Sequence, residues 1–155
     1  MKTIVINSNK LTAELKKQFD EVLKQAERDK FLGEDYIEST SGHKVIIDQK
    51  ENKVVGFFTP RASSRRGEKW WRAGALFLIQ QARGQGVMEK VLAEFFATHY
   101  PALSWIDDTN VKSIALFKRL GFKKERAMES DGHMGHWYLL IKPLKPAVET
   151  IKFSW

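Results

Sequence analysis

The spacing of apolar residues in the first third of the chain predicts a strand, a helix and a hairpin. Residues 4–6, Ile-Val-Ile, form a short apolar run typical of a strand. Apolar residues then recur at near 3.6 spacing between charged ones, at Leu11, Leu15, Phe19, Val22, Leu23 and Ala26. This period predicts an amphipathic helix, with Thr12 as a suitable N-cap and Gly33 beyond its charged end. Two further apolar runs, 44–47 and 54–58, flank a polar turn and predict a β-hairpin.

The middle of the chain predicts a strand, a glycine loop and a helix in direct succession. Trp70 to Ile79 is the longest apolar stretch and indicates one central strand buried on both faces. The residues from Val87 onward have a helical pattern that ends at Tyr100-Pro101. The charged residues Glu89, Lys90 and Glu94 are expected to face outward. The apolar residues are expected to face the core, at Val87, Val91, Leu92, Phe95 and Phe96. Between the strand and this helix lies Gln81-Ala82-Arg83-Gly84-Gln85-Gly86-Val87-Met88.

A glycine loop before a helix can gather several backbone N–H groups around one anion, because glycine adds no side-chain bulk and a helix start carries partial positive charge. A phosphate or pyrophosphate is the expected anion. The residues themselves leave open a second interpretation, a tight turn into a helix without a ligand.

The last third of the chain predicts a further strand, a short helix, a hairpin and an extension. Residues 103–106 are strand-like, and Asp107-Asp108-Thr109-Asn110 offers N-caps for a helix lined by Val111, Ile114, Phe117 and Leu120 and ended by Gly121. Residues 122–129 and 136–141 predict a final hairpin. In the extension 143–155, Ile151, Phe153 and Trp155 alternate with polar residues. This alternation predicts a strand that pairs with an edge of its own sheet or with a second subunit. Residues 1–155 are therefore expected to form one mixed α/β domain.

Composition narrows the class of protein. The 155 residues include no cysteine, which excludes disulfides, thiolate catalysis and cysteine-bound zinc and fits a reducing compartment. The chain shows neither a signal-peptide pattern nor eighteen consecutive apolar residues. We therefore expect a cytoplasmic protein without membrane association.

The net charge of +7 is partly concentrated in residues 61–72, where five cations stand beside Trp70 and Trp71. Such a loop could meet phosphates and stack on bases. The alternative is a solvated loop whose tryptophans turn into the core.

Two separated motifs now give a family resemblance that covers nearly the whole chain. Arg83-Gly84-Gln85-Gly86-Val87-Met88 resembles the pyrophosphate-binding loop of the GNAT superfamily of acetyl-CoA-dependent N-acetyltransferases, with Met88 in place of a small residue. Asn110, Ser113, Leu116, Phe117 and Gly121-Phe122 resemble the second motif of that family. The resemblance implies a mixed sheet flanked by helices, in which two central parallel strands splay apart.

The resemblance also implies a site for acetyl-CoA as cosubstrate. The backbone of Leu78 and Ile79 would contact the pantetheine arm, and the Leu78 N–H would stabilise the oxyanion. The loop amides, those of Arg83, Gly84, Gln85, Gly86, Val87 and Met88, would hold the diphosphate. Asn110, Ser113 and Phe117 would line the thioester end. Phe117 stands where many relatives carry a tyrosine as general acid, so Ser113 or a water held by Asn110 is a substitute proton donor.

The general base is not fixed by the motifs. The candidates are Asp107 and Asp108, at the end of their strand, and Glu68 on the substrate-side loop. For the two aspartates the alternative is helix capping, and a water that relays the proton is the alternative to any side-chain base. Glu68, Trp70 and Trp71 are expected on the substrate side. His133 and His136 resemble a metal pair, but without cysteine or a clear third ligand we expect a turn and no metal.

The sequence therefore predicts an enzyme that transfers an acetyl group to a primary amine. The acceptor is open between a protein amine, a small amine and an aminoacyl-tRNA. The alternative is a catalytically degenerate GNAT-fold module that binds nucleic acid or a partner protein, since Phe117 cannot donate a proton. A homodimer is one arrangement that the C-terminal extension allows.

Overall fold

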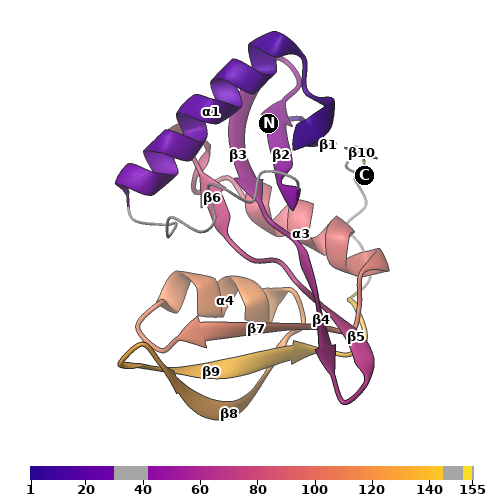
Figure 1. Ribbon diagram of the computed structural model, residues 1–155, viewed down its shortest axis with the longest axis vertical. Coiled ribbons are helices and arrows are strands. Elements are labelled where there is room, and N and C mark those ends of the chain that lie inside the picture. Colours follow the sequence, from indigo (N-terminus) through magenta and orange to yellow (C-terminus); the bar gives the residue numbers. More distant parts are fainter. Residues whose placement is uncertain (30–41, 145–151, 155) are drawn as a thin grey trace. The chain divides into compact units, whose positions relative to one another are not determined.

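The computed structural model describes residues 1–29, 42–144 and 152–154, and these contain two five-stranded sheets (Figure 1). The chain divides into two compact units. The first holds Met1–Arg61, Ala73–Val91 and Ile151–Trp155, and the second holds Ala62–Arg72 and Leu92–Thr150. The predicted mixed α/β class is confirmed. Among the described residues, no helix is long and apolar enough to cross a membrane.

The first unit contains a sheet with the strand order β10-β1-β2-β3-β6. Its strands are β1 (Thr3–Asn7), β2 (Lys44–Asp48), β3 (Lys53–Phe58), β6 (Leu76–Leu78) and β10 (Lys152–Ser154). The pairs β1–β2, β2–β3 and β3–β6 are antiparallel, whereas β10 runs parallel to β1. The strand predicted in the C-terminal extension is therefore present and pairs with a sheet edge.

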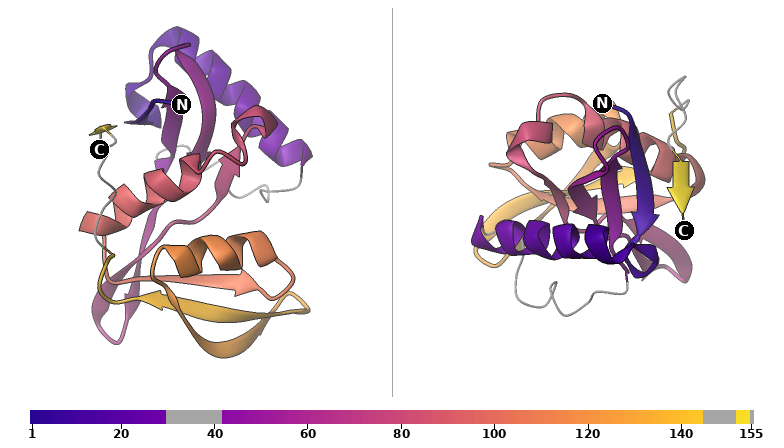
Figure 2. Two further views of the ribbon diagram at one scale, coloured as in Figure 1. Left: turned by 180° about the vertical axis from the view of Figure 1, so that it is seen from behind. Right: turned by 90° about the horizontal axis from the view of Figure 1, so that it is seen from above.

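One helix packs on this first sheet. Helix α1 (Ala13–Arg28) begins at the predicted N-cap, since Thr12 Oγ1 accepts a hydrogen bond from the Leu15 N–H at 3.3 Å. Its apolar stripe packs on β3, with the Phe19 and Phe57 rings 5.8 Å apart in an edge-on contact. Figure 2 shows α1 lying across one face of the sheet. A 3-10 turn, η1 (Ser8–Lys10), connects β1 to this helix. The proposed end signal Gly33 lies outside the described residues.

The second unit contains a sheet with the strand order β4-β5-β7-β9-β8. Its strands are β4 (Arg61–Arg65), β5 (Glu68–Arg72), β7 (Ala102–Asp107), β8 (Lys123–Ser130) and β9 (His133–Leu140). β5 runs parallel to β7, and β7–β9 and β9–β8 are antiparallel. Helix α4 (Val111–Arg119) follows β7, while helix α3 (Val87–Thr98) begins in the first unit and ends in the second.

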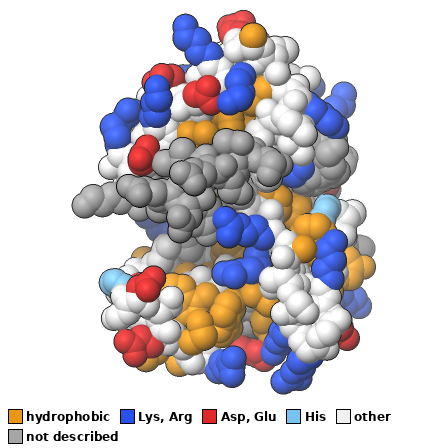
Figure 3. Space-filling view, in the orientation of Figure 1, with side chains coloured by type: hydrophobic (Ala, Val, Ile, Leu, Met, Phe, Trp, Pro, Cys, Tyr) orange, Lys and Arg blue, Asp and Glu red, His pale blue; other side chains and the backbone are white. Residues whose placement is uncertain are grey.

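The two faces of the second sheet carry different partners. On one face, Trp71 meets Phe95 and His99 of α3 at ring-centroid distances of 6.0 and 4.7 Å. On the other face, Trp70, Leu103 and Leu139 form a buried cluster with the partly buried Trp137 against it. Figure 3 shows hydrophobic side chains gathered over β7 and β9. We call this second surface the strand-only face, because its cluster contains no helical residue.

The predicted single strand from Trp70 to Ile79 is wrong. The structure divides this run between β5 of the second sheet and β6 of the first. The break falls at Gly74, whose φ is +69° and where a Cβ would lie 2.1 Å from the Thr59 carbonyl oxygen. Only glycine tolerates both this left-handed conformation and this close backbone approach. The apolar pattern hid the break because it continues through it.

Two segments expected as loops are strands. Residues 61–72 form the β4–β5 hairpin, since Arg66 and Gly67, with φ of 52° and 79°, complete a two-residue turn. The second turn, Asp131-Gly132, has φ of 51° and 78°. Strand β9 therefore begins at His133, and the turn predicted from His133 to His136 is wrong.

Candidate active site

The glycine loop of the first unit is exposed backbone with open space beside its two glycines. After the 3-10 turn η3 (Gln80–Ala82), Gly84 and Gly86 adopt φ of 75° and 72°, and a Cβ at either would meet nothing within 4 Å. The first backbone bond of α3 runs from the Lys90 N–H to the Gly86 carbonyl at 3.1 Å. The Val87 and Met88 amides therefore precede the helical ladder and lie at its positive end.

Met88, the residue that departs from the family motif, does not fill this loop. Its side chain is only 8% exposed and Val87 beside it 5%. Both anchor the helix start in the core. The substitution therefore adds bulk to the protein interior and leaves the loop amides in place.

Leu78 presents its backbone groups at a sheet edge. β6 is the outermost strand of the first sheet, and the next residue, Ile79, donates its N–H to the Val55 carbonyl at 2.9 Å. Because backbone groups alternate in direction along a strand, the Leu78 N–H and carbonyl point away from β3. A hydrogen bond from Arg83 Nε to the Leu78 carbonyl at 2.9 Å supports this direction of the carbonyl. The Arg83 guanidinium carbon also lies 5.5 Å from the centroid of the Phe77 ring. The Leu78 N–H thus faces outward beside the loop, as an oxyanion donor requires.

The second motif begins helix α4 in the second unit. Asn110 is its N-cap, and Asn110 Oδ1 accepts from the Ser113 N–H at 3.2 Å. Phe117 is buried at 3% exposure, with its ring 4.9 Å from Phe122. Gly121 has the predicted left-handed φ, 96°. Asn110 therefore has a structural task, while its amide N–H groups and the Ser113 hydroxyl are the polar groups that this turn offers to a ligand.

Asp107 closes the turn between β7 and α4. Its Oδ1 accepts from the Thr109 N–H at 2.8 Å and from the Thr109 hydroxyl at 2.7 Å. These two hydrogen bonds lower the pKa of Asp107 below its ordinary value, and the nearby His133 adds a smaller effect in the same direction. The carboxylate is therefore ionised throughout the neutral range.

Two aspartate–histidine pairs at this corner were missed from the sequence. Asp107 Oδ2 lies 3.2 Å from His133 Nδ1, and Asp108 Oδ1 lies 2.6 Å from His136 Nδ1. The pairing of Asp107 with Gly135 in the β7–β9 register brings these residues together. The two-residue turn of the last hairpin sets the β8–β9 register and not the β7–β9 register, so no local signal in the sequence predicts these pairs. Among the described residues, no group of three or more His, Cys, Asp and Glu could hold a metal ion.

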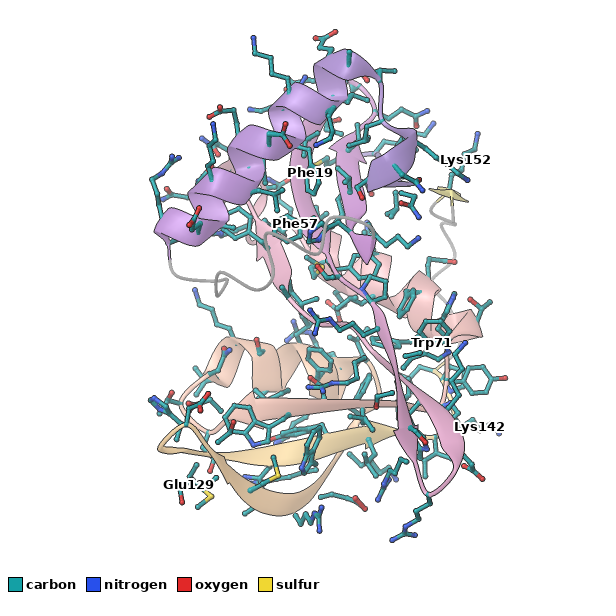
Figure 4. The ribbon with its side chains drawn as sticks, viewed as in Figure 1. Phe19, Phe57, Trp71, Glu129, Lys142 and Lys152 are labelled. Atoms are coloured by element: carbon teal, nitrogen blue, oxygen red, sulfur yellow. The ribbon has the colours of Figure 1, made fainter. Side chains whose placement is uncertain are left out.

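The three residues expected on the substrate side do not share one surface. Trp70 is buried in the strand-only face, and the Arg65 guanidinium carbon lies 4.9 Å from its ring centroid. Trp71, labelled in Figure 4, points to the opposite face, where Lys69 Nζ lies 4.3 Å from its ring centroid. Glu68 is exposed at the start of β5. The alternative with tryptophans turned into the protein therefore holds for Trp70, whose indole is not open to a substrate.

Comparisons with known proteins place this geometry in a family. A family model described as the acetyltransferase (GNAT) family matches residues 9–122. A search of curated proteins found no match. Among solved structures, a Bordetella pertussis protein described as a GnaT-family acetyltransferase is 21% identical with a TM-score of 0.54. The alignment covers 63% of this chain and 63% of the Bordetella chain.

Two further structures are matched over most of their length. Arabidopsis thaliana NAA60 in complex with acetyl-CoA is 13% identical with a TM-score of 0.68, over 90% of this chain and 99% of that one. A chain of the NatC complex bound to Gag peptide and CoA is 17% identical with a TM-score of 0.66, over 94% and 100%. These likenesses show the fold, and the family match covers well over half of the sequence. The chain belongs to the acetyltransferase (GNAT) family.

Proposed function

We propose that the protein is an N-acetyltransferase that moves an acetyl group from acetyl-CoA to a primary amine. The observation that carries the proposal is the open loop from Arg83 to Met88, set between the edge strand β6 and the start of α3. Both NAA60 and NatC, which share the fold, were solved with acetyl-CoA or CoA. The loop fits a diphosphate, because there is open space beside Gly84 and Gly86 and the loop leads directly into a helix N-terminus.

The residues divide the work of binding and transfer. Each hydrogen bond from a loop amide to the diphosphate contributes roughly 1.5–3 kcal/mol, so three or four are enough without a lysine. The Leu78 N–H, directed away from β3, is the donor for the carbonyl oxygen as it becomes an oxyanion. The outward edge at Leu78 is the proposed contact for the pantetheine arm. Ile79 uses both of its backbone groups within the protein, because its N–H donates to the Val55 carbonyl at 2.9 Å and its carbonyl accepts from the Ala82 N–H at 3.0 Å. Asn110 and Ser113 are the proposed polar groups for the thioester end.

The absence of a hydroxyl at Phe117 does not exclude transfer. A thiol has a pKa near 8.5, so a thiolate leaves with little protonation. The Ser113 hydroxyl, or a water held by the Asn110 amide, is the proton donor we propose. Phe117 itself is buried against the Phe122 ring.

The loop is tested by two matched glycine substitutions. Gly86 and Gly67 both have positive φ, 72° and 79°, and open space around a Cβ. Gly86→Ala and Gly67→Ala should therefore carry a similar strain of about 1–2 kcal/mol. We expect only Gly86→Ala to weaken acetyl-CoA binding, by roughly tenfold in a calorimetric titration, which corresponds to about 1.4 kcal/mol. Equal affinities for the two variants would place the acetyl-CoA site elsewhere.

Activity is tested by incubating the protein with acetyl-CoA and separate pools of peptides, tRNA and small amines. CoA release that depends on one pool, followed by mass spectrometry of the product, identifies the acceptor class. Acetyl-CoA binding without release in any pool favours the second candidate, a binding module, which the apolar Phe117 would permit.

A further inference from the structure

The strand-only face carries an aromatic surface beside the end of β7. Trp105 of β7 and Trp137 of β9 are direct cross-strand partners and lie side by side on this face. Both indole N–H groups point to one residue of β8, since Trp105 Nε1 donates to the Met128 carbonyl at 2.9 Å and Trp137 Nε1 contacts Met128 Sδ at 3.3 Å. We call Trp105, Trp137 and Met128 the aromatic platform.

The Trp105 ring packs directly on the backbone of Gly135, which has no side chain to separate them. A Cβ on Gly135 would lie 2.4 Å from Trp105 Cζ2 and 2.5 Å from its Cε2. The indole therefore covers Gly135 of β9, with its polar edge bonded to β8. Trp105 and Trp137 are both partly exposed, so the platform is rigid and reachable from solvent.

A fixed negative charge stands at one end of the platform. Asp107 is two residues beyond Trp105 on β7 and pairs in register with Gly135, so it shares the platform's face. Its side chain is 24% exposed, and its carboxylate is held by Thr109 and by His133. The other end is positive, because the Arg72 guanidinium carbon lies 5.6 Å from the Trp137 ring centroid.

This arrangement has the chemistry of a site for a monovalent ammonium group with an apolar neighbour. A carboxylate attracts the charge, and an indole face attracts both a cation and an aromatic or aliphatic group. A polyamine does not fit, since its second charge would approach Arg72. The corner is also where α4 begins, at Asn110.

We propose that Asp107 and Trp105 recognise the acceptor amine, and that this acceptor is a primary ammonium next to a bulky apolar or aromatic group. The inference rests on the proposed acetyl transfer and names the substrate class for it. Two sources have this chemistry, a free arylalkylamine and the N-terminal residue of a peptide. Asp107 then binds the protonated amine, whose proton passes to solvent water. The neutral nitrogen attacks the thioester carbonyl carbon, the C–N bond forms as the C–S bond breaks, and CoA leaves as a thiolate that takes up a proton.

Binding of phenethylamine to the full chain tests the recognition step without turnover. We expect saturable binding in a calorimetric titration, and at least tenfold weaker binding by Asp107→Asn. Glu125→Gln is the matched control, because Glu125 is a carboxylate of the same sheet that pairs with Arg65 at 3.5 Å. It should bind phenethylamine as the wild type does. No wild-type binding, or an equal loss in both variants, would overturn the proposal.

Acetylation rates distinguish a free arylalkylamine from a peptide N-terminus as the acceptor. They also show whether acetyl transfer itself fails while amine binding remains. With acetyl-CoA, a peptide that begins with Phe should be acetylated at least tenfold faster than one that begins with Gly, and spermidine should be a poor acceptor. Trp105→Leu should reduce the Phe-over-Gly preference while leaving acetyl-CoA affinity unchanged. Phenethylamine as the better acceptor would assign the small amine as the source. If phenethylamine binds but no amine is acetylated, the recognition site stands and acetyl transfer falls.

Discussion

Asp107 shows how a single turn fixes the charge of a side chain. Its lowered pKa arises chiefly from the Thr109 backbone N–H and then from the Thr109 hydroxyl. Because the folded pKa lies below the ordinary value of 3.8, the ionised carboxylate stabilises the fold above that value. The stabilisation is lost as the pH falls through the folded pKa. Neutral conditions therefore keep the carboxylate charged for an amine.

The hydroxyl contribution can be removed without removing the backbone bond. Thr109→Val keeps the shape of the residue and its N–H, so the pKa of Asp107 should rise toward its ordinary value without reaching it. Thr109→Ser, which retains a hydroxyl, should stay close to the wild type. NMR titration of the Asp107 carboxyl carbon measures both. An unchanged pKa in Thr109→Val would mean that the backbone bond alone sets it.

Gly135 makes a residue-scale prediction about the aromatic platform. Gly135→Ala places a methyl group against the Trp105 ring and should lower the free energy of unfolding by about 1–3 kcal/mol. Gly42→Ala is the control, since its nearest neighbour to a Cβ is 3.9 Å away, and should change stability by about 0.5 kcal/mol or less. Denaturant unfolding compares the two. Trp105→Ala should relieve most of the Gly135→Ala cost in the double variant, and simple additivity would contradict the contact.

Helix α4 joins a structural role and a proposed functional one at a single residue. Asn110→Ala removes the cap on the Ser113 N–H and should destabilise the protein by about 1 kcal/mol. Asn110→Ser keeps an N-cap oxygen and should retain near-wild-type stability, while it lacks the amide donors proposed to hold a water. A slower acetyl transfer by Asn110→Ser at unchanged denaturant midpoint would support that second role. Identical rates would confine Asn110 to capping.

The starts and ends of helices were predictable because they depend on nearby residues in the sequence. The errors concern features that depend on residues far apart in the sequence. The Thr12 and Asn110 caps and the Gly121 stop each depend on neighbours within four residues, so the sequence contains them. The division of Trp70 to Ile79 depends on the approach of Gly74 to Thr59, fifteen residues earlier along the chain. The Asp107–His133 and Asp108–His136 pairs likewise depend on the β7–β9 register. The glycine loop before α3 was predictable as a local structure, and its role in binding stays a prediction, whereas the partners of the aspartates were not predictable.

The chain's largest-scale connection is the parallel pairing of β10 with β1, between residues separated by almost the whole sequence. Ile4, Val5 and Ile6 pair with Lys152, Phe153 and Ser154. This pairing protects an edge of the first sheet that would otherwise expose unpaired backbone groups. The alternation of residues 151–155 predicted a strand, while its partner was open between the chain's own sheet and a second subunit.

Removal of residues 147–155 distinguishes these two partners. If β10 pairs within its own chain, the truncated protein should keep the solution mass of the full chain at matched concentrations. It should also lose roughly 1–3 kcal/mol of stability, the net value of two or three hydrogen bonds. If the strand is instead exchanged between subunits, the full chain is a dimer and truncation converts it to a monomer. Light scattering over a dilution series of both proteins measures the mass, and a truncation-dependent halving would overturn the intrachain pairing.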